Sequence, residues 1–151
     1  MSWEHRLHRA LDAHPDAPGT VRVTRDRGDS GDADAWAEVD VVRVDRIGVR
    51  VREVRVGHPP RDVAAEAERL AGALRDLPDR LAPVEVDRAL GGAVLRTRPE
   101  DLRRREFFEA TLTPEQTTIR RARAGDDGRE PAEFDLTREQ LGRIVEAIDG
   151  A

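Results

Sequence analysis

The segment from Trp36 to Val56, WAEVDVVRVDRIGVRVREVRV, constrains the fold most strongly, because it predicts one long β-hairpin. At its centre, residues 45–48 place Asp first and Gly fourth, which is typical of a type I turn. Valine-rich runs flank the turn on both sides. The implied register pairs their apolar positions as Val44/Val49, Val42/Val51, Val39/Val54 and Ala37/Val56.

This register predicts that the hairpin changes its buried face along its length. Successive side chains point to opposite sides of a strand, so the apolar residues near the turn and those far from it face opposite ways. A strongly twisted hairpin, covered at its two ends by different elements, would satisfy this pattern. One cover is predicted to be a second copy of the chain, and the residues of that dimer face are Ala37, Val39, Val54 and Val56.

The length of 151 residues predicts a single domain with its own core. Hydrophobic and charged residues each make up 38% of the chain, a hydrophobic share above that of disordered proteins. All 26 basic residues are arginine, and Lys, Asn and Tyr, whose codons are AT-rich, are absent, which indicates a GC-rich bacterial genome. The net charge of −5 disfavours a dedicated nucleic-acid binder.

Because the chain contains no cysteine, disulfides, thiolate zinc sites and cysteine nucleophiles are excluded. The first ten residues, MSWEHRLHRA, lack the basic region and apolar run of a signal peptide. No apolar stretch approaches the length of a membrane span. We therefore expect a soluble, cytoplasmic protein, and no motif predicts a cofactor.

Three helices are predicted from apolar periodicity and capping residues. Ser2 caps the first, Trp3 to Ala13, and the second extends from Arg61 to Leu77. Their apolar stripes are Trp3, Leu7, Ala10 and Leu11 in the first helix, and Val63, Ala67, Leu70, Leu74 and Leu77 in the second. Thr137 and Gln140 form a capping box for the last helix, which ends at Gly150.

Five further strand segments are predicted outside the long hairpin. Residues 20–25 form one, and residues 84–90 with 93–98 and 105–113 with 116–124 form two hairpins. The predicted cross-strand charge pairs are Glu85/Arg98, Asp87/Arg96, Glu109/Arg120 and Glu106/Arg123. The inward residues are Val86, Leu90, Ala93 and Leu95 in the first hairpin and Phe108, Ala110, Leu112 and Ile119 in the second. Residues 26–34 and 125–131 are predicted to be flexible loops.

The resulting order, α-β-β-β-α-β-β-β-β-α, predicts an α+β domain with a twisted antiparallel sheet of about seven strands and three helices. This order resembles that of the type III secretion chaperone-like fold, in which a helix precedes three strands, a second helix, further strands and a last helix. Two strands are additional here. The resemblance lies in element order alone, so it implies an architecture and not an activity.

One cluster of arginines is a candidate anion- or partner-binding site, because guanidinium groups suit carboxylates and phosphates. The cluster lies on neighbouring predicted strands and on the segment that joins them. Its members are Arg96, Arg98, Arg103, Arg120 and Arg121, with Arg104, Arg105 and Arg123 nearby. The alternative is a solvated ladder, since acidic residues are predicted opposite several of these arginines. RNA binding is disfavoured because Phe107 is the single aromatic ring predicted to point outward.

Other patterns have simpler explanations. His5 and His8 are spaced to chelate Zn²⁺ or Ni²⁺ from one helix face, but further ligands have no predictable position. Gly28-Asp29-Ser30-Gly31 matches the nucleophile segment of trypsin-like proteases, yet no partner histidine or aspartate can be placed. The Asp29, Asp32 and Asp34 series fails the EF-hand spacing. We interpret these as a solvated helix face and an acidic loop.

The sequence contains no activated nucleophile, no glycine-rich phosphate loop and no informative histidine–carboxylate pair. It therefore favours a non-catalytic protein-interaction or accessory domain, which binds a partner protein or a second copy through a sheet face, a sheet edge or a helix groove. The alternative is a small-molecule-binding or enzymatic α+β domain with an apolar pocket between sheet and helix.

Overall fold

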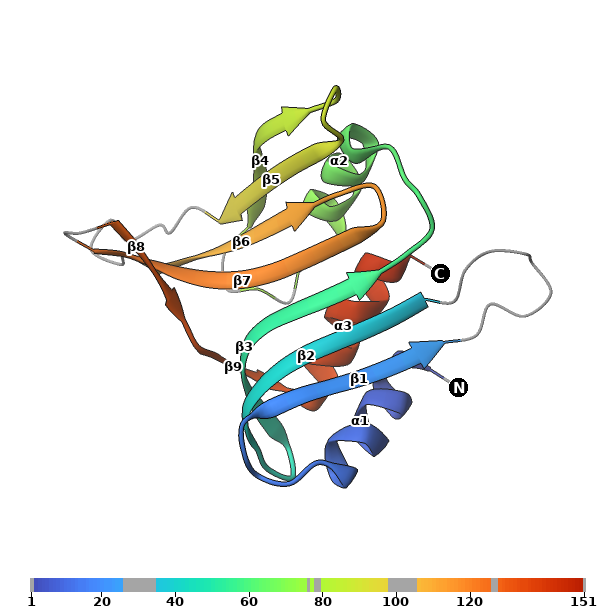
Figure 1. Ribbon diagram of the computed structural model, residues 1–151, viewed down its shortest axis with the longest axis vertical. Coiled ribbons are helices and arrows are strands. Elements are labelled where there is room, and N and C mark those ends of the chain that lie inside the picture. Colours follow the sequence, from blue (N-terminus) through green and yellow to red (C-terminus); the bar gives the residue numbers. More distant parts are fainter. Residues whose placement is uncertain are drawn as a thin grey trace.

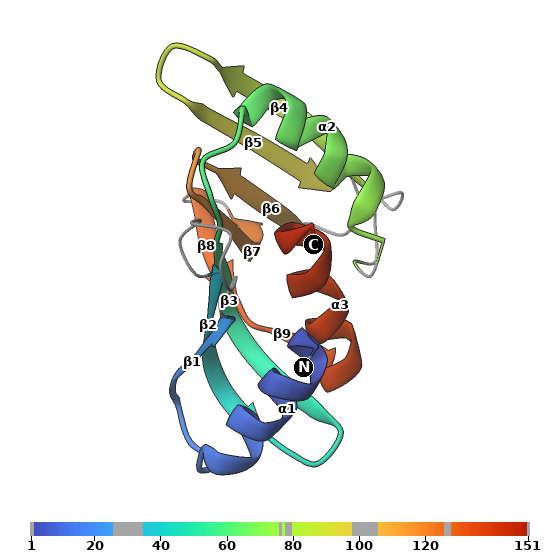
Figure 2. The same cartoon turned by 90° about the vertical axis from the view of Figure 1, so that its right-hand side faces the viewer.

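A computed structural model describes residues 2–25, 35–75, 77, 80–97, 106–125 and 128–150. Within these residues it contains a nine-stranded antiparallel sheet, and three helices cover one of its faces (Figures 1 and 2). The elements are α1 (Trp3–Ala13), β1 (Gly19–Arg25), β2 (Ala35–Val44), β3 (Gly48–Gly57), α2 (Val63–Ala73), β4 (Leu81–Asp87), β5 (Gly92–Thr97), β6 (Glu106–Leu112), β7 (Gln116–Gly125), β8 (Gly128–Ala132), β9 (Phe134–Thr137) and α3 (Arg138–Asp149). The predicted class and order are confirmed, and β8 and β9 are additional strands.

Two meanders meet at the centre of the sheet. The order is β1-β2-β3-β7-β6-β5-β4, so that β3, the last strand of the first meander, pairs with β7, the last strand of the second (Figure 1). Only residues 53–57 of β3 pair with β7, and residues 48–51 pair with β9 instead. The β8–β9 segment therefore enters the sheet between β7 and β3, because β8 pairs with the outer half of β7.

The central hairpin keeps one buried face throughout, contrary to the predicted change of face. Val44 pairs with Val49 and Val39 with Val54 as predicted, but Val51 pairs with Val41 and not with Val42. Two register irregularities explain the difference: Arg52 is an extra residue in β3, and Val42 is an extra residue in β2. Each β-bulge shifts the alternation by one position, which returns the next apolar residue to the core side.

The predicted dimer face is accordingly wrong. Ala37, Val39, Val54 and Val56 are each 0% exposed within a single chain, where they belong to the same core as Val49 and Val51. Their side chains pack beneath the helices and are not available to a second copy.

The helices form where capping residues and apolar stripes predict them. Ser2 accepts a hydrogen bond from the His5 backbone at the start of α1, and the Thr137–Gln140 capping box begins α3. Helix α2 is shorter than predicted, but Leu74 and Leu77 beyond its end are still buried. Within the described residues, no helix combines the length and the apolar character needed to cross a membrane.

The β4–β5 hairpin differs from its predicted register. Asp87 pairs with Gly92 and Ala82 with Arg96, because residues 88–91 form a longer turn in which Gly91 has φ of +70°. Ala93 and Leu95 face the core as predicted, whereas Val86 is 42% exposed and Leu90 is 85% exposed. The pairing predicted for Arg98 lies outside the described residues.

The β6–β7 hairpin follows the prediction: Glu109 pairs with Arg120 and Glu106 with Arg123 in register, and the four predicted inward residues are buried. The loop predicted at 125–131 is wrong for residues 128–131, which belong to β8. The loop predicted at 26–34 lies outside the described residues.

Replacing Val54 with Asp tests the single-core interpretation of the hairpin. The carboxylate would lie in the core without a partner, so we expect a loss of about 3 kcal/mol or more in the free energy of unfolding, measured by urea denaturation. The control is Ile47→Asp at the exposed hairpin turn, where a change within about 0.5 kcal/mol is expected. A Val54→Asp chain as stable as the parent would contradict the assignment.

Candidate interaction surface

The predicted arginine cluster does not form a single site. Arg96 and Arg120 lie on the helix-free face of the sheet, where they pair with Glu109 (2.6 Å) and Glu53 (3.1 Å). Arg121 follows Arg120 in β7 and therefore points to the helix side, where it pairs with Glu106 and lies 5.6 Å from the Phe108 ring centroid. Arg98 and Arg103 lie outside the described residues.

The helix-free face carries a ladder of alternating charges. Arg55 donates to both oxygens of Asp40 (2.9 Å each), and it also pairs with Glu38 and Glu53. The hydrogen bond from Arg55 is the main cause that holds the pKa of Asp40 below its usual value. Each of these described charges pairs with an opposite charge on the same strand or a neighbouring strand. This part of the face is therefore a network of internal ion pairs and not a basic patch.

His5 and His8, whose spacing would suit a metal ion, do not form a metal site with the other described residues. His8 lies 3.4 Å from Asp12 and 3.2 Å from the Arg138 guanidinium, and His5 is exposed. Among the described residues, no group of three or more His, Cys, Asp or Glu side chains is arranged to hold a metal ion.

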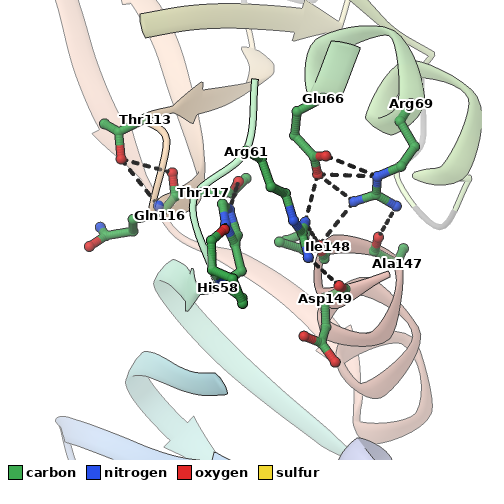
Figure 3. A network of polar contacts seen from close by, with 11 residues as sticks. His58, Arg61, Glu66, Arg69, Thr113, Gln116, Thr117, Ala147, Ile148 and Asp149 are labelled. Atoms are coloured by element: carbon green, nitrogen blue, oxygen red, sulfur yellow. Dashed lines mark hydrogen bonds and ion pairs between the residues drawn. The ribbon is translucent and has the colours of Figure 1, made fainter. Parts of the chain in front are cut away.

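A partly buried ionic network joins α2 and the segment before it to the end of α3 (Figure 3). Arg69 donates to the backbone carbonyls of Ala147 (2.7 Å) and Ile148 (2.9 Å), and Arg61 donates to Ile148 (2.6 Å) and Asp149. Glu66, which is 5% exposed, accepts hydrogen bonds from both guanidinium groups. Because every one of these contacts is internal, the network is structural.

His58 lies beside this network, also buried (Figure 3). Its Nδ1 is 3.0 Å from the Pro59 carbonyl, which can only accept, so Nδ1 carries the hydrogen and Nε2 accepts from the Thr117 hydroxyl at 3.2 Å. Burial is the main cause that lowers the pKa of His58, and the Arg61 and Arg69 charges lower it further. His58 is therefore held neutral.

The edge strand β1 has features that a binding surface requires. Its seven residues pair with β2 in continuous register, without proline and without a bulge, and no described strand pairs with its other edge. Arg22 lies back over β2, because its guanidinium stacks 4.9 Å from the Trp36 ring centroid and pairs with Glu38. Its charge is thus directed away from the open edge.

Helix α1 and β1 border a shallow, open groove beside this edge. The groove has a volume of about 340 Å³, and its lining residues are Arg6, Arg9, Ala10, Arg22 and Val23. Ala10 is small, which leaves room between helix and strand. Arg6 donates to the backbone carbonyl of Thr24 at 3.2 Å, so an α1 side chain reaches the edge-strand backbone at the end of the groove.

The opposite edge of the sheet is protected against strand pairing. Strand β4 contains Pro83, which has no N–H, and a register irregularity between Pro83 and Glu85. Prolines and bulges are common devices that prevent edge strands from pairing with other chains. Val84 on this strand is 54% exposed, but the backbone beside it is irregular. The regular edge is therefore β1.

Charge also distinguishes the groove beside β1 from two other surface hollows. The hollow at the central hairpin turn includes Arg43 and Arg50 but also Asp45 and Asp135. The hollow beside β8 balances three arginines with three glutamates: Arg50, Arg121 and Arg123 with Glu106, Glu130 and Glu133. The described lining of the β1 groove contains three arginines and no carboxylate.

Local sequence patterns did not identify this surface. The strand at 20–25 was predicted, but an open edge depends on strand order, which local periodicity does not encode. One sequence signal for this surface was present in α1. Arg6 and Arg9 lie beside the small residue Ala10 among the apolar positions of the helix, which indicates a basic surface with room next to it.

The buried His58 predicts a pH-dependent stability. Because its folded-state pKa is lowered from 6.5, the unfolded chain binds the proton first, and His58 contributes stability above pH 6.5 that is lost as the pH falls through and below this value. We expect His58→Gln to lose less unfolding free energy than the parent between about pH 7.5 and 5.5 in urea titrations. His5→Gln, at an exposed position, is the control, and equal losses in the parent and His58→Gln would refute the assignment.

Three comparisons with known proteins give no relative from which a function can be transferred. No family model, no curated protein and no solved structure matches the chain.

Proposed function

We propose that this protein is a non-catalytic protein-interaction domain that binds an extended segment of a partner along β1. The observation that carries the proposal is a regular, proline-free edge strand of seven residues beside a groove bordered by α1. In strand addition, main-chain hydrogen bonds supply affinity, and neighbouring side-chain sites supply specificity. Edge and groove together offer both.

The direction of the edge hydrogen bonds follows from the Arg6 contact. The carbonyl of Thr24 accepts from a side chain of α1, so it points away from β2. The N–H and C=O of one residue in an antiparallel strand point to the same side, and alternate residues repeat that direction. The backbone groups that point to the open edge are thus those of Thr20, Arg22 and Thr24, of which the Thr24 carbonyl already accepts from Arg6, while Val21 and Val23 face the core.

The alternative, a ligand domain with a pocket between sheet and helices, has less support. The space where α1 and α3 lie on the sheet is occupied by large, fully buried side chains, among them Trp3, Leu7, Leu141 and Ile144. The three hollows described above are open to the surface. Charged residues form most of the lining of two of them and four of the ten lining residues of the hollow at the hairpin turn. None of the three hollows resembles the apolar, enclosed pocket typical of small-molecule sites.

Replacing Thr24 with Pro tests strand addition, since it removes an N–H from the open edge and not from the β1–β2 ladder. We expect peptides selected from a displayed random library on the parent protein to bind Thr24→Pro at least about tenfold more weakly, a change of about 1.4 kcal/mol. Thr24→Val keeps the N–H and has nearly the same shape, so it should bind like the parent.

Hydrogen exchange provides an independent measurement: a bound peptide should slow exchange at the backbone amides of residues 20, 22 and 24. Peptides that bind Thr24→Pro as tightly as Thr24→Val, or a library that yields no binder, would refute the proposal. Far-UV circular dichroism and urea midpoints establish that both variants are folded.

A further inference from the structure

We infer that the segment recognised along β1 is acidic, with carboxylates at alternate positions. This inference rests on the proposed function and specifies the chemistry of its partner. A strand added to β1 would place every second side chain on the helix side of the sheet, over the groove bordered by α1. Of the described lining residues, Arg6 and Arg9 present guanidinium groups on this side, Arg22 directs its guanidinium to the helix-free face, and none carries a carboxylate.

Arg9 is the arginine whose charge is most available. It is exposed on α1, and no described residue forms an ion pair with it, whereas Arg22 pairs with Glu38 and Arg6 contacts Thr24. A positive groove also contrasts with the net charge of −5 of the chain. Complementary charge at a binding surface increases specificity and the association rate, and like charges exclude wrong partners.

A second copy of the chain fits this surface less well. Pairing two β1 edges would bring two grooves lined by arginine toward each other, and like charges at an interface are unfavourable. A nucleic-acid strand is also less suited, because the groove lining offers no aromatic ring on which bases could stack. An acidic polypeptide can use both the arginines and the backbone of the edge.

The experiment uses fluorescein-labelled peptides of roughly nine residues, the length needed to span a seven-residue strand. One alternates glutamate with threonine, a second replaces each glutamate with glutamine, and a third replaces it with lysine. Binding to the full chain is followed by fluorescence anisotropy at low and moderate salt, about 50 and 300 mM. The glutamate peptide should bind most tightly, and its affinity should fall with salt.

The decisive variant is Arg9→Glu, which reverses a charge without removing a described contact. We expect the glutamate peptide to bind Arg9→Glu at least tenfold more weakly, and Arg9→Lys to retain most of the affinity. The matched control is Arg46→Glu at the exposed hairpin turn, which changes the net charge equally but lies outside the groove lining and should bind like the parent.

The outcomes separate this inference from the proposed function. Equal binding of the glutamate and glutamine peptides, with loss only in Thr24→Pro, would overturn the acidic inference and leave strand addition supported. Binding that Thr24→Pro does not weaken would overturn both. Equal weakening by Arg9→Glu and Arg46→Glu, or no binding of the glutamate peptide, would overturn the acidic inference, while the library selection still decides strand addition.

Two further outcomes would assign the surface to another occupant. Light scattering that detects a concentration-dependent dimer, abolished by Thr24→Pro, would give the edge to a second copy. A labelled single-stranded oligonucleotide that binds with Arg9-dependent affinity, unaffected by Thr24→Pro, would give the groove to nucleic acid. Either result would overturn the inference of an acidic peptide.

Discussion

The last turn of α3 ends in backbone carbonyls that the helix itself cannot satisfy, and two guanidinium groups from the other half of the molecule donate to three of them. The helix has no basic residue in its last turn, so Arg61 and Arg69 supply the positive charge that a helix C-terminus favours. Glu66 fixes the spacing of the two guanidinium groups. This contact matters because α3 lies against α1 and β3, while α2 lies on β4 and β5. It thus holds the two meanders together where the sheet joins them by a short β3–β7 pairing.

The two edge strands at the ends of the sheet differ in regularity, because β4 is interrupted and β1 is not. A proline and a bulge interrupt β4. At β1, by contrast, the arginine that could shield the edge is drawn onto Trp36, whose indole lies flat over Gly57: a methyl group at Gly57 would approach the indole Nε1 to 2.0 Å. The absence of a side chain at Gly57 therefore permits the stacking that keeps Arg22 off the edge.

Local patterns predicted the helices and most strands because capping residues and apolar periodicity act over a few neighbours. The bulges at Val42 and Arg52 were not predictable in this way, since an inserted residue and a genuine change of face produce the same alternation. Gly91-Gly92 suggested a two-residue turn, but Gly91 alone adopts positive φ within a longer one. The arginine cluster failed for a similar reason: Arg120 and Arg121 are adjacent in sequence and therefore face opposite sides of the sheet. Strand order, and with it the open edge, emerges from long-range packing.

Contacts between α3 and the N-terminal elements have a consequence for folding during synthesis on the ribosome. The indole of Trp3 donates to the carboxylate of Asp149 at 3.0 Å, a contact between residues 146 positions apart. Strand β9 and helix α3 are translated after the first meander, yet β9 pairs with β3 and α3 packs on α1. The first meander therefore leaves the ribosome with only α1 to cover its valine-rich face, and the part that lies under α3 stays uncovered until residues 138–149 emerge. Apolar surface that is exposed during folding in this way is prone to aggregation.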